Sequence, residues 1–181
     1  MKNLIFVILL FISFSVLSQE IKKVKVIPRN EKDTTYVSDG DTFKYLDPES
    51  NLFRTARLKH IDAPEYCIRC KSKQSKKRNN QQYGRESRNF LYNLLQNSEP
   101  IIFIYGMDNY GRDIVEVFVG HININRLMVA SGNAWWYYKY SDENEYNELE
   151  KFAKKEKLGL WSFSDPIFPE QFRKNKKSTS R

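Results

Sequence analysis

Apolar and polar residues alternate over short runs in the first half of the chain, and turn residues separate the runs. This alternation predicts strands over about residues 21–27, 34–37, 42–46 and 53–61. Gly40 sits between two of these runs, and a turn rich in Asp, Pro and Asn covers residues 47–51. The pattern therefore indicates a meander of short strands.

The second half adds two further strands, predicted over about residues 101–105 and 114–119. Apolar residues share one helical face over residues 84–97, and again after Asp142. Asn123 can cap a short helix that Gly132 ends, and Gly159 is placed to stop the last helix. The prediction is one α+β domain of about five strands and three helices.

The two ends of the chain differ in composition from its body. Residues 1–18 carry one early cation, Lys2, and then an apolar run shorter than the roughly 20 residues that a membrane span needs. We interpret them as a signal peptide cut after Ser18, with an uncleaved anchor helix as the alternative. Residues 19–165 would form the domain, and the basic residues 166–181 a flexible tail. The mature protein is then expected to be secreted or periplasmic, without stable membrane association.

The chain is basic, with a net charge of +8, which draws it to polyanions without choosing among them. Basic residues gather over residues 65–82, where apolar residues are scarce. This predicts a solvated surface loop, with a nucleic-acid-binding arm as the alternative. Cys67 and Cys70 in this loop lack the second pair that a zinc site needs. A local disulfide in an oxidising compartment is the main interpretation, and a redox-active pair is the alternative.

The candidate chemistry lies in three polar clusters, at residues 39–42, 62–65 and 108–112. Asp41 and Asp62 supply carboxylates that can hold a hard cation, and Glu65 supplies one that can handle a proton. Arg57 and Arg112 supply guanidinium groups that can bind phosphate oxygens in a bidentate way. Taken alone, the acids have ordinary turn chemistry as the alternative, and Arg57 a surface salt bridge. As a set, these groups are what phosphodiester cleavage requires.

The order and spacing of the clusters resemble the staphylococcal nuclease family over about residues 35–162. The motifs that carry the resemblance are Asp39-Gly40-Asp41-Thr42, the run from Arg57 to Glu65, Tyr110-Gly111-Arg112, and the run from Lys154 to Trp161. The resemblance implies an OB-fold, a five-stranded β-barrel with three helices. It also implies Ca²⁺-dependent hydrolysis of DNA and RNA by metal-assisted attack of water.

By position, the resemblance assigns metal binding to Asp41, Asp62 and the main-chain carbonyl of Ala63. Such a set leaves several of the roughly 6 to 8 oxygen positions around calcium for water and a substrate phosphate. Glu65 falls on the acid that activates the attacking water. Whether Glu65 instead holds a metal-bound water in place stays open.

The resemblance also assigns the substrate contacts. Arg57 and Arg112 fall on the two phosphate-binding arginines of the family. Tyr138 and Tyr140 match tyrosines that line its nucleotide pocket, and Tyr110 matches another aromatic residue beside that pocket. The aromatic run 135–140 suits both core packing and a stacking surface for bases, and the sequence does not decide between the two.

The sequence thus predicts an exported Ca²⁺-dependent nuclease that acts on DNA and RNA as a monomer. Two other functions remain open. The first is a catalytically inactive OB-fold module that binds nucleic acid. The second is a basic exported protein that binds anionic envelope polymers, which explains the charge but leaves Asp41, Asp62 and Glu65 without a role.

Overall fold

The first half of the chain forms the short strands that the alternation predicts. The computed structural model describes residues 20–24, 36–68, 70, 72–73, 79–140 and 144–178. Its first strands are β1 (Glu20–Lys23), β2 (Val37–Asp39), β3 (Thr42–Leu46), β4 (Phe53–Leu58) and β5 (Ile61–Asp62). The predicted strand over residues 53–61 is broken between β4 and β5 because His60 takes a positive φ of 67°. The proposed signal peptide, residues 1–18, lies outside the described residues.

The second half adds four strands, four helices and two single 3₁₀ turns among the described residues. The strands are β6 (Ile101–Met107), β7 (Asp113–Val119), β8 (Ile122–Asn123) and β9 (Trp135–Trp136). The helices are α2 (Gly84–Leu95), α3 (Ile124–Ala130), α4 (Asn144–Lys155) and α5 (Pro169–Ser178), and the 3₁₀ turns are η2 (Tyr138–Tyr140) and η3 (Gly159–Ser162). The predicted cap is confirmed, because the Asn123 side chain accepts a hydrogen bond from the Arg126 N–H at 3.1 Å.

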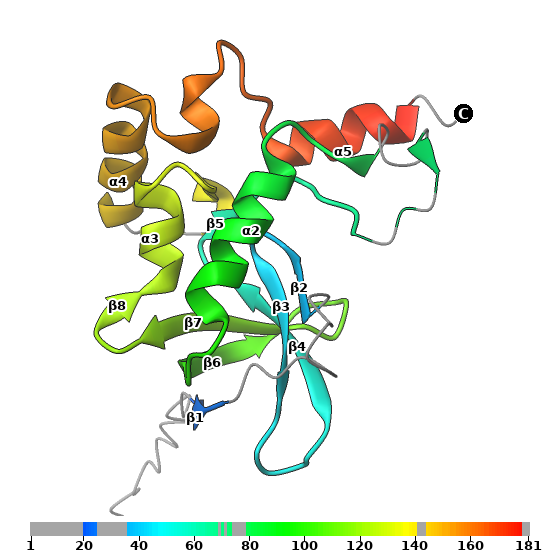
Figure 1. The fold of residues 1–181 in the computed structure, drawn as a ribbon, viewed down its shortest axis with the longest axis vertical. Coiled ribbons are helices and arrows are strands. Elements are labelled where there is room, and N and C mark those ends of the chain that lie inside the picture. The colour runs from blue at the N-terminus through cyan, green and yellow to red at the C-terminus, as the bar shows by residue number, and fades with distance from the viewer. Residues whose placement is uncertain are drawn as a thin grey trace, which may run out of the picture.

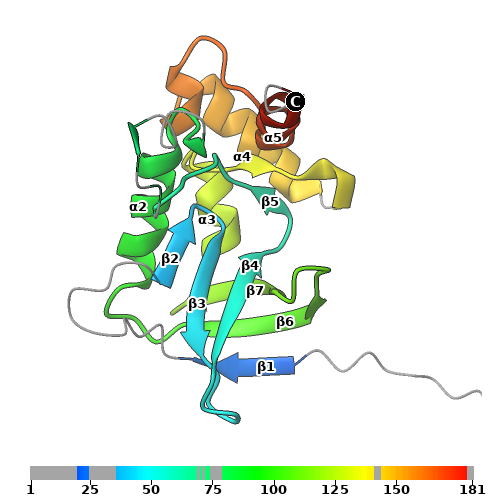
Figure 2. The ribbon, with the colours of Figure 1, turned by 90° about the vertical axis from the view of Figure 1, so that its right-hand side faces the viewer.

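Seven strands form one sheet in the order β1-β6-β7-β4-β3-β2, with β8 paired to β7, while β5 and β9 form a separate pair. The β4–β7 pair is parallel and the other pairs are antiparallel. In Figures 1 and 2, β3 and β4 cross over β6 and β7.

The α+β class is confirmed, but the expected closed five-stranded barrel is not seen. Within the described residues, β1 and β2 end the sheet without pairing with each other. The edge at β2 is covered by α2 instead, where the Arg88 Nε–H donates to the Val37 carbonyl at 3.0 Å. A helix therefore satisfies an edge carbonyl that a closing strand would otherwise bond.

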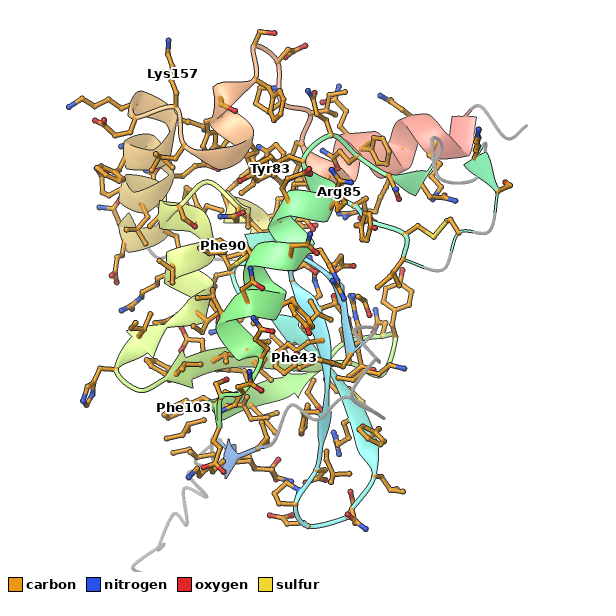
Figure 3. The ribbon with its side chains drawn as sticks, in the orientation of Figure 1. Phe43, Tyr83, Arg85, Phe90, Phe103 and Lys157 are labelled. Carbon is orange, nitrogen blue, oxygen red and sulfur yellow. A yellow bond between two sulfur atoms is a disulfide. The ribbon has the colours of Figure 1, made fainter. Side chains whose placement is uncertain are left out.

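The core lies between the sheet and the helices α2 and α3. Phe43, Tyr45 and Leu91 are fully buried there, and Figure 3 shows Phe43 inside the body of the molecule. Asn125 is also buried. Its side chain accepts a hydrogen bond from the Val117 N–H and donates to two carbonyls, those of Lys59 and Val115, all at 3.0 Å. This one amide fixes α3 to the end of β4 and to the middle of β7, because buried backbone groups need partners.

The last helices differ from the prediction. α4 ends at Lys155, earlier than a stop at Gly159 would give, because Lys157 already takes a positive φ of 51°. The tail expected to be flexible contains α5, which lies at the end of the molecule opposite β1 (Figures 1 and 2). Residues 169–178 therefore form a helix that the sequence analysis did not predict.

The loop after β5 carries the disulfide that the spacing predicts. Cys67 and Cys70 are bonded to each other, which confirms the pairing. The Cys67 N–H also donates to the Asn80 side-chain oxygen at 2.8 Å, so the loop is tied to the residues just before α2. No helix of the described part of the chain is long and apolar enough to cross a membrane.

Candidate active site

The turn between β2 and β3 holds Asp41 in a fixed position. Its main-chain carbonyl accepts a hydrogen bond from the Leu58 N–H at 2.8 Å. One carboxylate oxygen accepts from the Thr42 hydroxyl and the other from the Ala63 N–H, each at 2.8 Å. Only 2% of Asp41 is exposed. The carboxylate is thus tied both to β4 and to the segment that follows β5.

Two glycines let the acidic segments approach α2 closely. A Cβ atom at Gly40 would lie 1.9 Å from the Ser87 Oγ atom, and one at Gly84 would lie 2.3 Å from the Glu65 carbonyl oxygen. Because any larger side chain would collide, both positions require glycine. The first turns of α2 therefore support both the Asp41 turn and the Glu65 segment.

Arg57 lies between the two predicted metal-binding carboxylates. Its Nη1 atom contacts Asp41, and its Nη2 atom lies 2.7 Å from the Oδ1 atom of Asp62. The Arg57 side chain is 14% exposed, and Asp62 is fully buried. The structure therefore brings Asp41 and Asp62 to one guanidinium group. Arg57 forms buried ion pairs rather than the surface salt bridge that was the alternative.

Several acids are buried together at this end of the sheet, and their surroundings shift their pKa values. Burial and the neighbouring charge of Asp41 raise the pKa of Asp39 well above its usual range. Burial also opposes ionisation of Asp41, but the charge of Arg57 and the Ala63 N–H hold the pKa of Asp41 below its ordinary value. Burial raises the pKa of Asp62, although an arginine that pairs with it acts in the opposite direction. A further cation at this place would stabilise the ionised acids.

Arg112 reaches the same place from the turn between β6 and β7. Its Nε–H group donates to the Oδ2 atom of Asp108 at 2.8 Å, and its Nη2 atom forms an ion pair with the same oxygen at 2.7 Å. Its Nη1 atom lies 3.5 Å from the Thr42 hydroxyl, which itself donates to Asp41. Arg112 thus borders the acidic cluster, while Arg57 lies inside it.

The predicted tyrosines are spread over the surface around the site. Tyr110, in the same turn as Arg112, is 86% exposed, and Tyr138 is 58% exposed. The side chain of Tyr140 lies outside the described residues. The structure divides the aromatic run 135–140, because Trp135 is buried in the core at 6% exposure whereas Tyr138 faces solvent.

Sequence reasoning missed Arg173, on α5. Its Nη1–H group donates to the Glu65 Oε1 atom at 2.6 Å, and its Nη2–H group donates to the Asp62 Oδ2 atom at 2.8 Å. The signal for α5 was present in the sequence: Pro169 suits the first helical position, Glu170 suits the first turn, and Lys174 follows Glu170 at helical spacing. The contact with Asp62 was not readable, because more than a hundred residues separate the partners.

The residues present fit a divalent cation by their chemistry. Asp41 and Asp62 are buried oxygen donors directed at one point, and Asp39 and Glu65 add acids to the same cluster. The acids thus outnumber the two arginines that pair with them, Arg57 and Arg173. Nowhere in the described ranges do three or more His, Cys, Asp or Glu side chains form a complete metal-binding group. Any ion here would therefore complete its shell with backbone, water or substrate oxygens.

Fold and site together define an α+β protein whose buried acids and arginines suit the binding of a phosphate ester. The sequence profile of the family described as staphylococcal nuclease homologue matches residues 55–163. The chain belongs to this family, which confirms the recognition made from the motifs.

Similar proteins carry related names. An uncharacterized endonuclease of Haemophilus influenzae is 31% identical over 94% of this chain and 83% of its own length. Another, of Escherichia coli O157:H7, is 32% identical over 74% of this chain and 78% of its own. A probable staphylococcal-like nuclease of Oryza sativa subsp. japonica is 30% identical over 69% of this chain, which spans only 23% of that longer protein.

Proposed function

We propose that this protein is a nuclease, a hydrolase that uses Ca²⁺ to cleave phosphodiester bonds of both DNA and RNA. The observation that carries the proposal is the meeting of the Asp41 and Asp62 carboxylates on the guanidinium group of Arg57. Membership of a nuclease family and the endonuclease names of its relatives support the reaction class.

The metal-binding role falls to Asp41, Asp62 and the Ala63 carbonyl. Bound there, a calcium ion would supply positive charge to a phosphate oxygen and a place for the attacking water. Asp41 is already oriented by hydrogen bonds from Thr42 and Ala63, and its Oδ1 atom also contacts Arg57.

The arginines and Glu65 supply the remaining chemistry. Arg57 and Arg112 would donate hydrogen bonds to phosphate oxygens as negative charge builds in the transition state. Glu65 has a side chain that is 30% exposed, so it can take a proton from a water that enters from solvent. Tyr110 and Tyr138 offer exposed rings on which bases can stack without sequence preference.

Export is part of the proposal. The Cys67–Cys70 disulfide suits an oxidising compartment. It supports the interpretation of residues 1–18 as a signal peptide and a secreted or periplasmic location for the protein, which we propose to act as a monomer.

Digestion of supercoiled plasmid and of RNA by the purified protein, over a Ca²⁺ titration with a chelator control, tests this function. We expect cleavage of both substrates that depends on Ca²⁺. Glu65→Gln and Arg112→Ala should each lower turnover by on the order of a hundredfold, because each removes a group that acts in the transition state. Arg85→Ala, which removes a side chain that is 69% exposed on α2, is the control and should cleave normally.

Binding of nucleic acid without cleavage at any Ca²⁺ concentration would instead establish the inactive binding module. Salt-sensitive adhesion to anionic polymers without hydrolysis would establish the envelope-binding alternative. Normal turnover in both active-site variants would contradict the roles given to Glu65 and Arg112.

A further inference from the structure

The C-terminal segment, defined here as residues 167–178, occupies both halves of the candidate site. On the acidic side, Arg173 pairs with the Asp62 carboxylate through two N–H groups, at 2.8 and 3.2 Å, and with Glu65 at 2.6 Å. Asp62 is a proposed metal ligand, and Glu65 is the proposed proton acceptor. In this arrangement both acids face a guanidinium group of the protein itself.

On the aromatic side, Phe168 packs on the run that was a candidate surface for bases. Its ring centre lies 6.0 Å from that of Trp135, 6.0 Å from that of Tyr137 and 6.4 Å from that of Tyr138. An aromatic ring of the chain therefore lies beside Tyr137 and Tyr138, while Tyr138 itself stays 58% exposed. One segment thus contacts the acids through its guanidinium group and the aromatic run through its ring.

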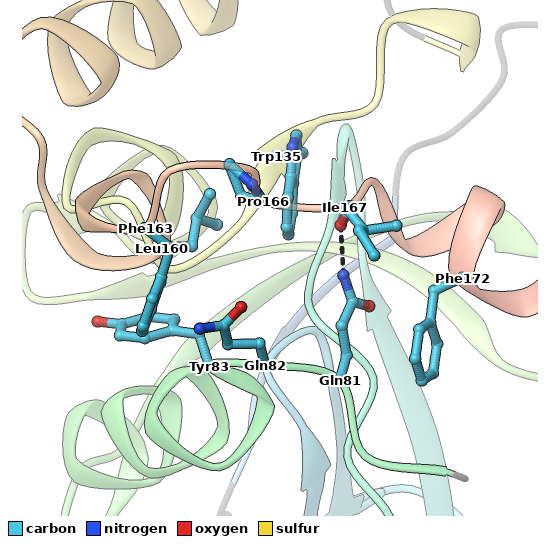
Figure 4. A pocket seen from close by; sticks show the side chains of 9 residues that line it. All are labelled: Gln81, Gln82, Tyr83, Trp135, Leu160, Phe163, Pro166, Ile167 and Phe172. Carbon is cyan, nitrogen blue, oxygen red and sulfur yellow. Dashed lines mark hydrogen bonds between the residues drawn. The ribbon is translucent and has the colours of Figure 1, made fainter.

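Besides the contacts of Arg173 and Phe168, polar pairs attach the segment to the rest of the molecule. Lys139 pairs with Glu170 at 2.5 Å, and the Gln81 side-chain amide donates to the Ile167 carbonyl, as the dashed line in Figure 4 shows. A cavity of about 60 Å³ remains along this contact, between Trp135, Phe163 and Phe172 among others (Figure 4). The contact is therefore incompletely packed, which lowers the dispersion energy lost when the segment leaves.

We propose that the C-terminal segment is an autoinhibitory latch, in which Arg173 holds carboxylates that a divalent cation needs and Phe168 fastens the segment to the aromatic run beside them. The latch rests on the proposed function, because it acts on that same site. Metal and substrate then bind only when α5 moves away.

A divalent cation can replace Arg173 reversibly, because the charge of Asp62 stays compensated in both states. Asp62 is fully buried, and a buried carboxylate without a partner is costly. A divalent cation that arrives as Arg173 leaves keeps that carboxylate compensated. The Arg173 side chain is 38% exposed, so its guanidinium group has a direct path into water. The apparent metal affinity is then reduced by the fraction of molecules in which the latch is closed.

Calorimetric titration of the purified full chain with Ca²⁺ alone tests whether Arg173 competes with the metal ion. Arg173→Gln should tighten Ca²⁺ binding about tenfold or more, because the competitor is removed. Lys174→Gln is the matched control, since it removes the same charge from the next position, where the side chain is 70% exposed and pairs only with Glu170 among the described contacts. Phe168→Ala opens the latch without a change of charge and should also tighten binding.

Amide hydrogen exchange of the unaltered protein gives a readout that does not depend on folding of a variant. Saturating Ca²⁺ should increase the exchange of the α5 amides, because the helix is released from its contacts. Unchanged protection of α5 at saturating Ca²⁺ would overturn the latch. So would equal Ca²⁺ affinities of Arg173→Gln and Lys174→Gln, or tightening by Arg173→Gln that Phe168→Ala does not share.

The latch and the proposed function can fail separately. Ca²⁺-dependent cleavage by the unaltered protein, with α5 still protected at saturating Ca²⁺, would leave the nuclease in place and remove the latch. Release of α5 by Ca²⁺ without cleavage of either nucleic acid would keep the latch and remove the nuclease.

Discussion

Arg57 shows how one side chain can serve both the fold and the site. It carries the only positive charge that contacts Asp41 among the described ion pairs, and it shares Asp62 with Arg173. Desolvation would lower the pKa of its guanidinium group, but the charges of Asp41 and Asp62 raise that pKa above its usual value. Arg57 is therefore held as a cation that the two buried acids require.

Replacement of Arg57 by alanine should therefore destabilise the fold. We expect Arg57→Ala to lower the free energy of unfolding by about 3–5 kcal/mol, because buried carboxylates lose their partner. Urea denaturation in chelator measures this change. The control is Arg85→Ala, whose side chain is 69% exposed, and which should change the free energy by less than about 0.5 kcal/mol. Equal stabilities of the two variants would show that the Arg57 ion pairs contribute nothing to the fold.

For the individual site residues, the sequence was informative where residues are close along the chain or share a motif. The motifs placed Asp41, Asp62 and Arg57 in one site, and the structure brings them together. They could not place Arg173, since nothing near it in sequence distinguishes an arginine that reaches Asp62 from one that reaches solvent.

Among the elements, the end of α3 and the start of η3 meet backbone to backbone. A Cβ atom at Gly132 would lie 2.2 Å from the Leu158 carbonyl oxygen, and one at Gly159 would lie 2.2 Å from the Gly132 carbonyl oxygen. The Leu160 N–H donates to that same Gly132 carbonyl at 2.9 Å. Two backbone segments thus pack directly on each other, which fixes the position of Trp161 behind Trp135.

Gly132→Ala should reveal this contact as a loss of stability. Gly132 has a φ of 69°, so alanine adds backbone strain as well as a collision with a carbonyl group. We expect a loss of about 3 kcal/mol in the free energy of unfolding, measured by urea denaturation. Gly120→Ala is the matched control: Gly120 has a φ of 60° with no atom within 4 Å of its Cβ position, so the loss should be about 1 kcal/mol. Similar losses in both variants would mean that the collision is relieved by movement.

The strands and helices with clear periodicity were predictable, and their ends were less so. Asn123 and Gly132 marked α3 correctly, because a cap and a left-handed residue act locally. The break between β4 and β5 escaped prediction, since His60 has no sequence feature that demands a positive φ. The open edge at β2 was equally unreadable, because α2 covers it through a contact distant in sequence.

For the molecule as a whole, the pair of Lys139 and Glu170 connects the C-terminal helix to the body. Hydrogen bonds from Lys139 and then Lys174 lower the pKa of Glu170 to about 2. A group whose pKa is lower in the folded state stabilises that state above its unfolded pKa, and the contribution is lost as the pH falls through the folded value. The attachment should therefore weaken between about pH 4.5 and pH 2.

Carboxyl NMR titration of Glu170 checks this expectation. The midpoint should lie near pH 2 in the unaltered protein and move up toward the ordinary glutamate value in Lys139→Gln, which removes the first donor. A midpoint that Lys139→Gln does not move would show that the ion pair seen here is not formed in solution.

The contact between Gly40 and Ser87 has a consequence for how this sequence can change over time. A methyl group at residue 40 would overlap the Ser87 hydroxyl at 1.9 Å and approach the Ala63 methyl at 2.8 Å. Shortening Ser87 first would relieve only the overlap with its hydroxyl, and that hydroxyl donates to the buried Asn133 carbonyl at 2.6 Å, which would then lose its partner. Neither single step is neutral, so drift at residues 40 and 87 must pass through a disfavoured intermediate, and a directed-evolution library that samples one codon at a time should leave both unchanged.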